Sequence, residues 1–257
     1  MRHAMNPAHV LPLFRASFTM VFRARGVLYV FVYSPALMLV FALMNNLDWG
    51  TGDQHIDFRD FVIPGMAAFL AAHLFQDIVT ALAASYRARG VLTRLAVTPV
   101  CAPLVVAVQM VTYVVFGVAN GALVLAVGKL VGVDIRLTTN LLWAVLLIGM
   151  VVLTALAFAF AIAGFLPNPQ SANAVSGAIG LPLAFLSGAT YPIAALPGPL
   201  PDIVPWAVPF ASSIQAIRGI ALDGNSITAY GLEVAVGVGW LLVAFALAAK
   251  AYRFTDE

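Results

Sequence analysis

The sequence predicts an all-α polytopic membrane protein that crosses the bilayer six times. Of its 257 residues, 62% are hydrophobic and only 9% are charged, and the mean hydropathy is +0.98. A soluble domain is about 45–50% apolar and about 25% charged. A water-facing globule of this size could not bury so much apolar surface, so lipid is the medium that the composition fits. The spacing of the apolar residues into long uninterrupted segments supports the same fold class.

Six segments have the length and composition of a transmembrane helix. A hydrocarbon core of about 30 Å requires roughly 20 apolar residues per helix. The segments that meet this requirement are residues 27–44, 61–83, 103–128, 141–165, 174–190 and 230–250. Pro182 interrupts the fifth segment. The first follows three arginines, as a signal peptide would, but it has no Ala-x-Ala cleavage site before Asn45, so we expect it to be retained.

The distribution of lysine and arginine predicts the orientation. Six spans place both termini on one side of the membrane. Nine cations fall on that side and four on the other, which predicts cytoplasmic termini by the positive-inside rule. Four aspartates in the first loop of the opposite side, between the first two spans, agree with this orientation.

Two stretches outside the spans have an amphipathic character. Residues 1–26 form an N-terminal segment in which phenylalanines alternate with arginines, which predicts a helix in the cytoplasmic interface. A simple extension of the first span is nearly as good an interpretation. Residues 191–229 contain six prolines, which exclude a continuous span, yet they are too apolar for a solvated loop. We expect an external re-entrant helical hairpin and linker, anchored by Trp206 at the membrane interface.

The stretch 85–99 is unusually basic for this chain, because it holds Arg87, Arg89 and Arg94. On a helix of 100° per residue, its apolar side chains share one sector and two of the arginines lie beside it. Pro99 disfavours a helical Thr98. The stretch therefore predicts a short cytoplasmic helix. Its arginines either set the topology alone or also dock a soluble protein.

Two motifs resemble the permease subunits of type-2 ABC transporters, which export drugs, lipids or polysaccharides. The first is Gly90-x-x-Thr93-x-Leu95-x-x-Thr98-Pro99, between the second and third spans. The second runs from Leu186-Ser187-Gly188 through Tyr191-Pro192-Ile193, Leu196-Pro197 and Pro209-Phe210 to Ala216-Ile217-Arg218. The resemblance implies a coupling helix on an ATPase, with the contact made by Arg87, Arg89, Gly90, Thr93, Arg94 and Leu95. It also implies a hairpin that includes Tyr191, Pro192, Pro197 and Trp206. Relatives commonly carry glutamates before the glycine, where this chain has Tyr86-Arg87-Ala88-Arg89.

The resemblance also implies partners. The only Gly-Lys pair, Gly128-Lys129, is followed by Leu130 and preceded by Leu123 where a phosphate-binding loop would need glycine. We therefore expect no directly bound cofactor, with ATP and Mg²⁺ on a separate ABC ATPase subunit. A second permease, identical or related, would complete the pathway in a bacterial cytoplasmic membrane, and we expect no nucleic-acid partner. Together they would move a hydrophobic or amphipathic substrate outward by alternating access.

Three polar residues within or beside the predicted spans are candidates for the substrate path: His73, Asp77 and Ser187. His73 and Asp77 are four residues apart and share a helical face. They form either a functional pair or a packing pair near the cytoplasmic interface. The four histidines and the single cysteine are scattered, so we expect no metal site and no catalytic site. An ion-coupled secondary transporter and a non-transporting membrane scaffold are the alternative functions.

Overall fold

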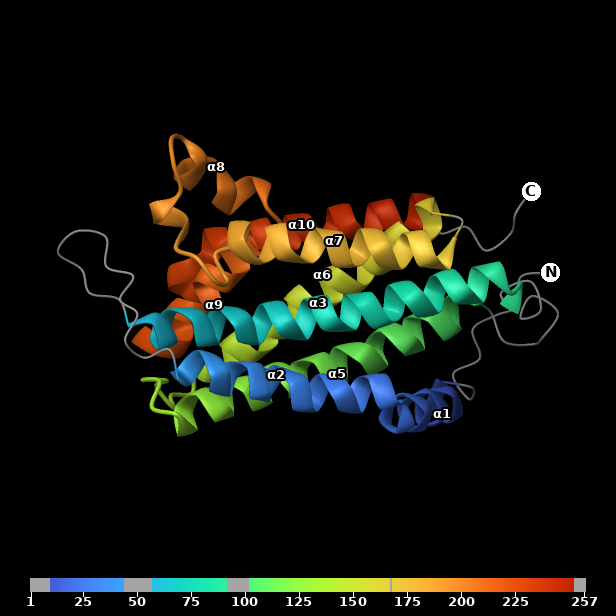
Figure 1. The fold of residues 1–257 in the computed structure, drawn as a ribbon, viewed down its shortest axis with the longest axis horizontal. Helices are drawn as coiled ribbons and strands as arrows, with labels where there is room; N and C mark the ends of the chain where they lie inside the picture. The colour runs from blue at the N-terminus through green and yellow to red at the C-terminus, as the bar shows by residue number, and fades with distance from the viewer. Residues whose placement is uncertain (1–9, 44–56, 92–101, 167, 252–257) are drawn as a thin grey trace.

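The computed structural model describes residues 10–43, 57–91, 102–166 and 168–251. Within these ranges, six long helices lie side by side, and the shorter helices lie toward the two ends of the bundle (Figure 1). The long helices are α2 (Arg25–Leu43), α3 (Phe58–Ala88), α5 (Ala102–Leu130), α6 (Leu141–Phe165), α7 (Pro169–Leu186) and α10 (Gly231–Ala251). The shorter elements are α1 (Val10–Arg23), η2 (Ile193–Ala195), α8 (Leu200–Ala207), α9 (Ala211–Asp223) and η3 (Ile227–Tyr230).

Helix α3 forms the centre of the bundle. It packs against α2, α5, α6, α7 and α9, and 78% of its most apolar 18-residue window is buried. Four alanines, Ala67, Ala68, Ala71 and Ala72, are fully buried and allow neighbouring backbones to approach closely. Polar side chains on α3 therefore lie inside the protein rather than in lipid.

The contact between α5 and α6 depends on the Gly117-x-x-x-Gly121 pair. A Cβ atom at Gly117 would lie 2.7 Å from Val152, and one at Gly121 would lie 2.8 Å from Ile148. Small residues at this spacing permit close helix approach in membranes. Within the described chain the motif serves packing between its own helices.

Among the described residues, five helices are long and apolar enough to cross a membrane: α2, α3, α5, α6 and the segment Ile227–Ala251 that contains α10. The fifth predicted span corresponds to α7, which does not meet the same criterion. Helix α7 begins earlier than the predicted segment, at Pro169, and ends at Leu186. Its 18 residues reach only about 27 Å, and its first turns are polar. It nevertheless runs from one end of the bundle to the other beside α3 (Figure 1).

The chain alternates between the two ends of the bundle, as the sequence predicts. The end of α3, the beginnings of α5 and α7 and the end of α10 lie at the same end as α1 (Figure 1). We call this the α1 end. The hairpin elements α8 and α9 lie at the opposite end, which we call the hairpin end. The assignment of the α1 end to the cytoplasm stays a prediction.

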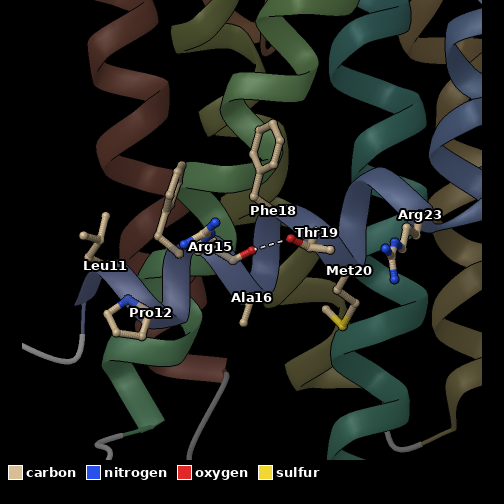
Figure 2. Close-up of a pocket in the computed structure, with 9 residues that line it drawn as sticks. Leu11, Pro12, Arg15, Ala16, Phe18, Thr19, Met20 and Arg23 are labelled. Carbon is tan, nitrogen blue, oxygen red and sulfur yellow. Dashed lines mark hydrogen bonds between the residues drawn. The ribbon is translucent and has the colours of Figure 1, made fainter.

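Helix α1 is separate from the first span. The helix ends at Arg23 and α2 begins at Arg25, with the Ala24 amide donating to the Val21 carbonyl at 3.1 Å. Figure 2 shows α1 running across the long helices rather than along them. Its Phe18 ring packs on Phe116 of α5, with 5.0 Å between centroids. The interpretation as an extension of the first span is therefore wrong, and location in the membrane interface stays a prediction.

Residues 191–229 contain the α-helices α8 and α9 with a sharp turn between them, and the expected re-entrant hairpin stays a prediction. Phe210 makes the turn with φ of 75°, a left-handed conformation that is rare for a bulky residue. Its side chain is buried, and α9 continues from it into the core against α3 and α6. Helix α8 extends away from the bundle (Figure 1) and packs through Val204 on Ile193 of η2. Where the hairpin lies relative to the bilayer stays a prediction.

Candidate functional site

The last turn of α3 is attached to the end of α6 by Arg87. The Arg87 guanidinium donates hydrogen bonds to the carbonyl oxygens of Ala163, at 3.4 Å, and of Gly164. These carbonyls lie in the last turn of α6, where helix geometry leaves acceptors without intrahelical partners and the helix dipole favours a cation. Arg87 therefore joins two core helices at the α1 end of the bundle.

Arg89 and Gly90 end the helix. Arg89 is the C-cap residue of α3 and its side chain is exposed. Gly90 adopts φ of 62°, and a Cβ atom there would meet nothing within 4 Å. Only the backbone conformation therefore requires glycine at this position. The remaining predicted coupling residues Thr93, Arg94 and Leu95 lie outside the described residues.

The structure differs from the predicted helix 85–99 in one respect. Residues 85–88 belong to α3, which continues for a turn past the predicted end of the span at residue 83. Because Arg87 binds the end of α6, the extra turn is held against the bundle.

A polar cluster lies between α3 and α7. The His73 Nε2 atom is 3.7 Å from Asp77 Oδ2, and the Ser176 hydroxyl donates to Asp77 Oδ1 at 2.6 Å. Gln76 donates from Nε2 to the Ser176 Oγ at 3.3 Å. Ser176 and Gln76 are buried, whereas the Asp77 side chain is 34% exposed. Sequence reasoning identified only the two ionisable members of this cluster.

Gly180 completes the cluster. A Cβ atom at Gly180 would fall 2.0 Å from His73 Nε2, so the imidazole lies directly on the α7 backbone. The buried residues of α7 are Ala172, Ser176, Gly180 and Ala184, which form a stripe of small side chains with a spacing of four. This spacing is visible in the sequence and is the signal that could have identified the contact.

The depth of the cluster bears on the two interpretations of His73 and Asp77. Asp77 lies about three helical turns, roughly 16 Å, before α3 ends at Ala88. His73 lies at the middle of α3 and stacks on Phe69, with 5.4 Å between the ring centroids. The pair therefore lies deeper in the bundle than a location near the cytoplasmic interface requires.

Ser187, the third candidate for the substrate path, is separate from this cluster. It caps α7 near the hairpin end, about 10 Å along the axis from Gly180. Its side chain is buried, and its Oγ has no hydrogen-bond partner among the described residues. The next residue, Gly188, adopts φ of 74° and turns the chain toward η2.

Arg218 connects the hairpin to the core. Its Nε atom donates to the Phe61 carbonyl at 3.0 Å, and its Nη2 atom donates to the Gly188 carbonyl at 2.6 Å. A Cβ atom at Gly65 would lie 2.7 Å from Nη2, so the guanidinium fits against the backbone of α3. Burial lowers the pKa of Arg218 to about 9, which still leaves it protonated at neutral pH. Sequence reasoning treated this residue as one more cation outside the membrane.

The predicted hairpin residues surround the turn into α8. Pro192 is buried, and Tyr191 donates from its hydroxyl to the Ala195 carbonyl at 3.5 Å. Pro197 is exposed in the turn that precedes α8. Trp206 is 47% exposed, and its carbonyl accepts a hydrogen bond from Trp240 Nε1 at 3.1 Å, which attaches α8 to α10.

Two further features of the structure concern metal binding and a groove along α1. Within the described residues there is no group of three histidine, cysteine, aspartate or glutamate side chains that could hold a metal ion. An open groove of about 1010 Å³ runs along α1. Figure 2 shows the side chains that line it, which are mostly apolar but include Arg15 and Arg23. This groove is far from the polar cluster, and its lining is typical of a helix surface against lipid headgroups.

In the part of the chain that the structure describes, five apolar helices long enough to span a bilayer pack in one bundle, which defines a multi-pass membrane protein. The family model described as ABC-2 type transporter matches residues 9–222, and the chain belongs to this family of transport permeases. Members generally pair with an ABC ATPase subunit and have no ATP site of their own. A search of curated proteins found no match.

Proposed function

We propose that this chain is the membrane subunit of an ATP-driven exporter that moves a hydrophobic or amphipathic substrate outward. A separate ATPase would bind and hydrolyse ATP with Mg²⁺, and a second permease subunit would complete the pathway. Family membership supports the class of protein. Outward direction, the type of substrate and the ATPase partner are the parts that we propose.

The observation that carries the proposal is the attachment of α3 at the α1 end. Arg87 joins the last turn of α3 to α6, while Arg89 remains exposed beyond it. A soluble subunit that contacts residues 85–99 would therefore move two central helices together. Such a movement is what alternating access requires of a coupling segment.

The same movement would reach the polar cluster. Helix α3 carries His73 and Asp77 against Ser176 and Gly180 of α7. A shift of α3 along α7 would break the bond between Ser176 and Asp77 and change the surroundings of the imidazole. We propose that this cluster lies on the substrate path or controls access to it, because ionisable groups inside a bilayer are costly unless they face protein or a polar pathway.

The ionisable pair of His73 and Asp77, near the middle of α3, also favours the alternative function of an ion-coupled secondary transporter. Inside-out vesicles that contain the chain and a partner ABC ATPase subunit distinguish ATP-driven export from ion-coupled transport. We expect uptake of the amphipathic dye rhodamine 6G to require ATP and to stop when the ATPase Walker lysine is changed. Uptake driven by a proton gradient in the absence of ATP would contradict the proposal and support a secondary transporter.

A further inference from the structure

A cavity of about 340 Å³ lies at the hairpin end, between α8, α9 and α10. Its volume is within the range of small-molecule sites. Helix α8 contributes Asp202 and Trp206, α9 contributes Ser212 and Gln215, and the first turn of α10 contributes Glu233. Three elements that are separate in the sequence thus supply its polar lining.

The charge of the cavity is negative. Asp202 and Glu233 both line it, and no lysine or arginine does so among the described residues. Within the described part of the chain, neither carboxylate forms an ion pair. The nearest cation along α9, Arg218, directs its guanidinium to carbonyl oxygens of Phe61 and Gly188 instead. The two carboxylates are therefore available to a cationic ligand.

The buried side chain of Ser212 is a second, independent indication that the cavity binds a ligand. Its residue is 1% exposed, it lines the cavity, and its Oγ has no hydrogen-bond partner among the described residues. A buried hydroxyl without a partner is costly, because it has lost its bonds to water. A ligand with donor groups in the cavity would satisfy it.

The cavity lining also includes the aromatic side chain of Trp206. Trp206 lines the cavity with a ring that is about half exposed, and Trp240 fixes the adjacent backbone through the bond to the Trp206 carbonyl. Indole faces attract organic cations, and quaternary ammonium groups are the ligands that such faces recognise in aromatic cages. A metal ion would need a larger set of carboxylate, imidazole or thiolate ligands than this lining offers.

We propose that this cavity binds the ammonium group of an amphipathic organic cation. The two carboxylates attract the positive charge, Ser212 and Gln215 accept hydrogen bonds from the N–H groups of the ammonium, and Trp206 contacts the carbon atoms around the nitrogen. The ammonium group belongs either to a free organic cation or to a lipid headgroup. The inference narrows the substrate class of the proposed exporter and in that respect rests on the proposed function, but the binding itself needs no ATPase.

The test uses the purified full chain in a nonionic detergent, without any ATPase, so that failure of coupling and failure of binding are distinguishable. Isothermal titration with protonated N,N-dimethylhexylamine, which carries one N–H donor, measures Kd, and hexanesulfonate serves as the ligand of opposite charge with the same alkyl chain. We expect D202N/E233Q to raise Kd by about tenfold or more. D223N removes an exposed acid at the same end outside the cavity, and we expect it to change Kd by less than about twofold.

E233Q alone and W206L are the second set of variants, in case the double variant does not fold. Each should raise Kd severalfold while the melting temperature of the protein stays near that of the wild type. The proposal is overturned if the double variant and both single variants bind as the wild type does. It is equally overturned if hexanesulfonate binds as tightly as the cation.

Nanodiscs distinguish the two sources of the ammonium group. If a lipid headgroup occupies the cavity, nanodiscs that contain phosphatidylethanolamine should weaken binding of protonated N,N-dimethylhexylamine relative to nanodiscs of phosphatidylglycerol alone. This competition should be absent in D202N/E233Q. Equal binding in the two lipids by the wild type would identify a free organic cation as the ligand.

Discussion

The Arg218 guanidinium lies over the ring of Phe61, with its Cζ atom 3.7 Å from the ring centroid. The same side chain donates to the Phe61 carbonyl from Nε and to the Gly188 carbonyl from Nη2. One residue of α9 therefore holds the beginning of α3 and the turn after α7 at once. The hairpin is attached to the core through this cation.

Changing Arg218 to lysine should lower the melting temperature. A lysine keeps the charge, but its single ammonium cannot reproduce the planar fork that meets two carbonyls and a ring together. Loss of one charge-assisted hydrogen bond costs about 1.5–3 kcal/mol. Differential scanning fluorimetry of the purified chain measures the shift. R136K is the matched control at the hairpin end, where the side chain is exposed and donates to the Asp223 carbonyl at 2.9 Å. Equal melting temperatures for R218K and the wild type would contradict the role of Arg218 in attaching the hairpin to the core.

Substitution by alanine should lower the stability of the protein at Gly180 of α7 but not at Gly177 of the same helix. G180A would place a methyl group against His73 and force the imidazole away from Asp77, so we expect a loss of about 1–3 kcal/mol from overpacking. At Gly177 a Cβ atom would meet nothing within 4 Å, so G177A should leave the protein unchanged or stabilise it by up to about 1 kcal/mol. Thermal melting of both variants provides the comparison. A G180A protein as stable as G177A would contradict the contact between α7 and His73.

Valine at Gly121 should disrupt the contact between α5 and α6. A Cβ atom there already approaches Ile148 within 2.8 Å and the Ala67 carbonyl within 3.3 Å, so a branched side chain has no room. We expect a lower yield of folded protein and a loss of about 1–3 kcal/mol. G239V on α10 is the control, because its Cβ would enter open space. Size-exclusion chromatography and melting show whether only G121V is affected.

Gly90 should tolerate asparagine better than valine. Its φ of 62° costs a branched residue about 1–2 kcal/mol, whereas asparagine visits this conformation more readily. Because no atom lies within 4 Å of its Cβ position, a side chain at this position would not clash with other residues. We expect G90V to reduce ATPase coupling severalfold with little change in the melting of the bundle. Identical coupling in G90V, G90N and the wild type would show that this conformation is not needed.

The sequence predicted the bundle well because length and apolar composition decide which helices can lie in lipid. The absence of one continuous helix after α7 was also predictable, since the six prolines of residues 191–229 exclude it. Helix α7 was harder to predict from the sequence. Its buried stripe consists of small residues, and most of its large apolar side chains lie on its outer face. Its polar first turns lie where the sequence placed the preceding loop.

The contacts of individual polar residues were less predictable. Arg87 and Arg218 looked like topology determinants, because a linear count of cations cannot show that their guanidinium groups meet carbonyls more than 25 residues away. The pairing of Asp77 with Ser176 and the meeting of Asp202 with Glu233 likewise depend on how helices that are distant in sequence pack. Only His73 and Asp77, which lie on one helix, could be paired from spacing alone.

The most direct test of the account measures ATP hydrolysis by a partner ABC ATPase subunit, with the permease in nanodiscs as wild type, R89E or R136E. Arg89 is exposed at the α1 end and takes no part in the attachment of α3 to α6, so its charge can be reversed without disturbing the core. R136E makes the same change at the hairpin end. The account predicts that R89E weakens the complex by at least about tenfold and lowers hydrolysis, while R136E behaves as the wild type. Normal assembly of R89E, or loss of assembly only in R136E, would contradict the proposal that the ATPase docks beyond α3.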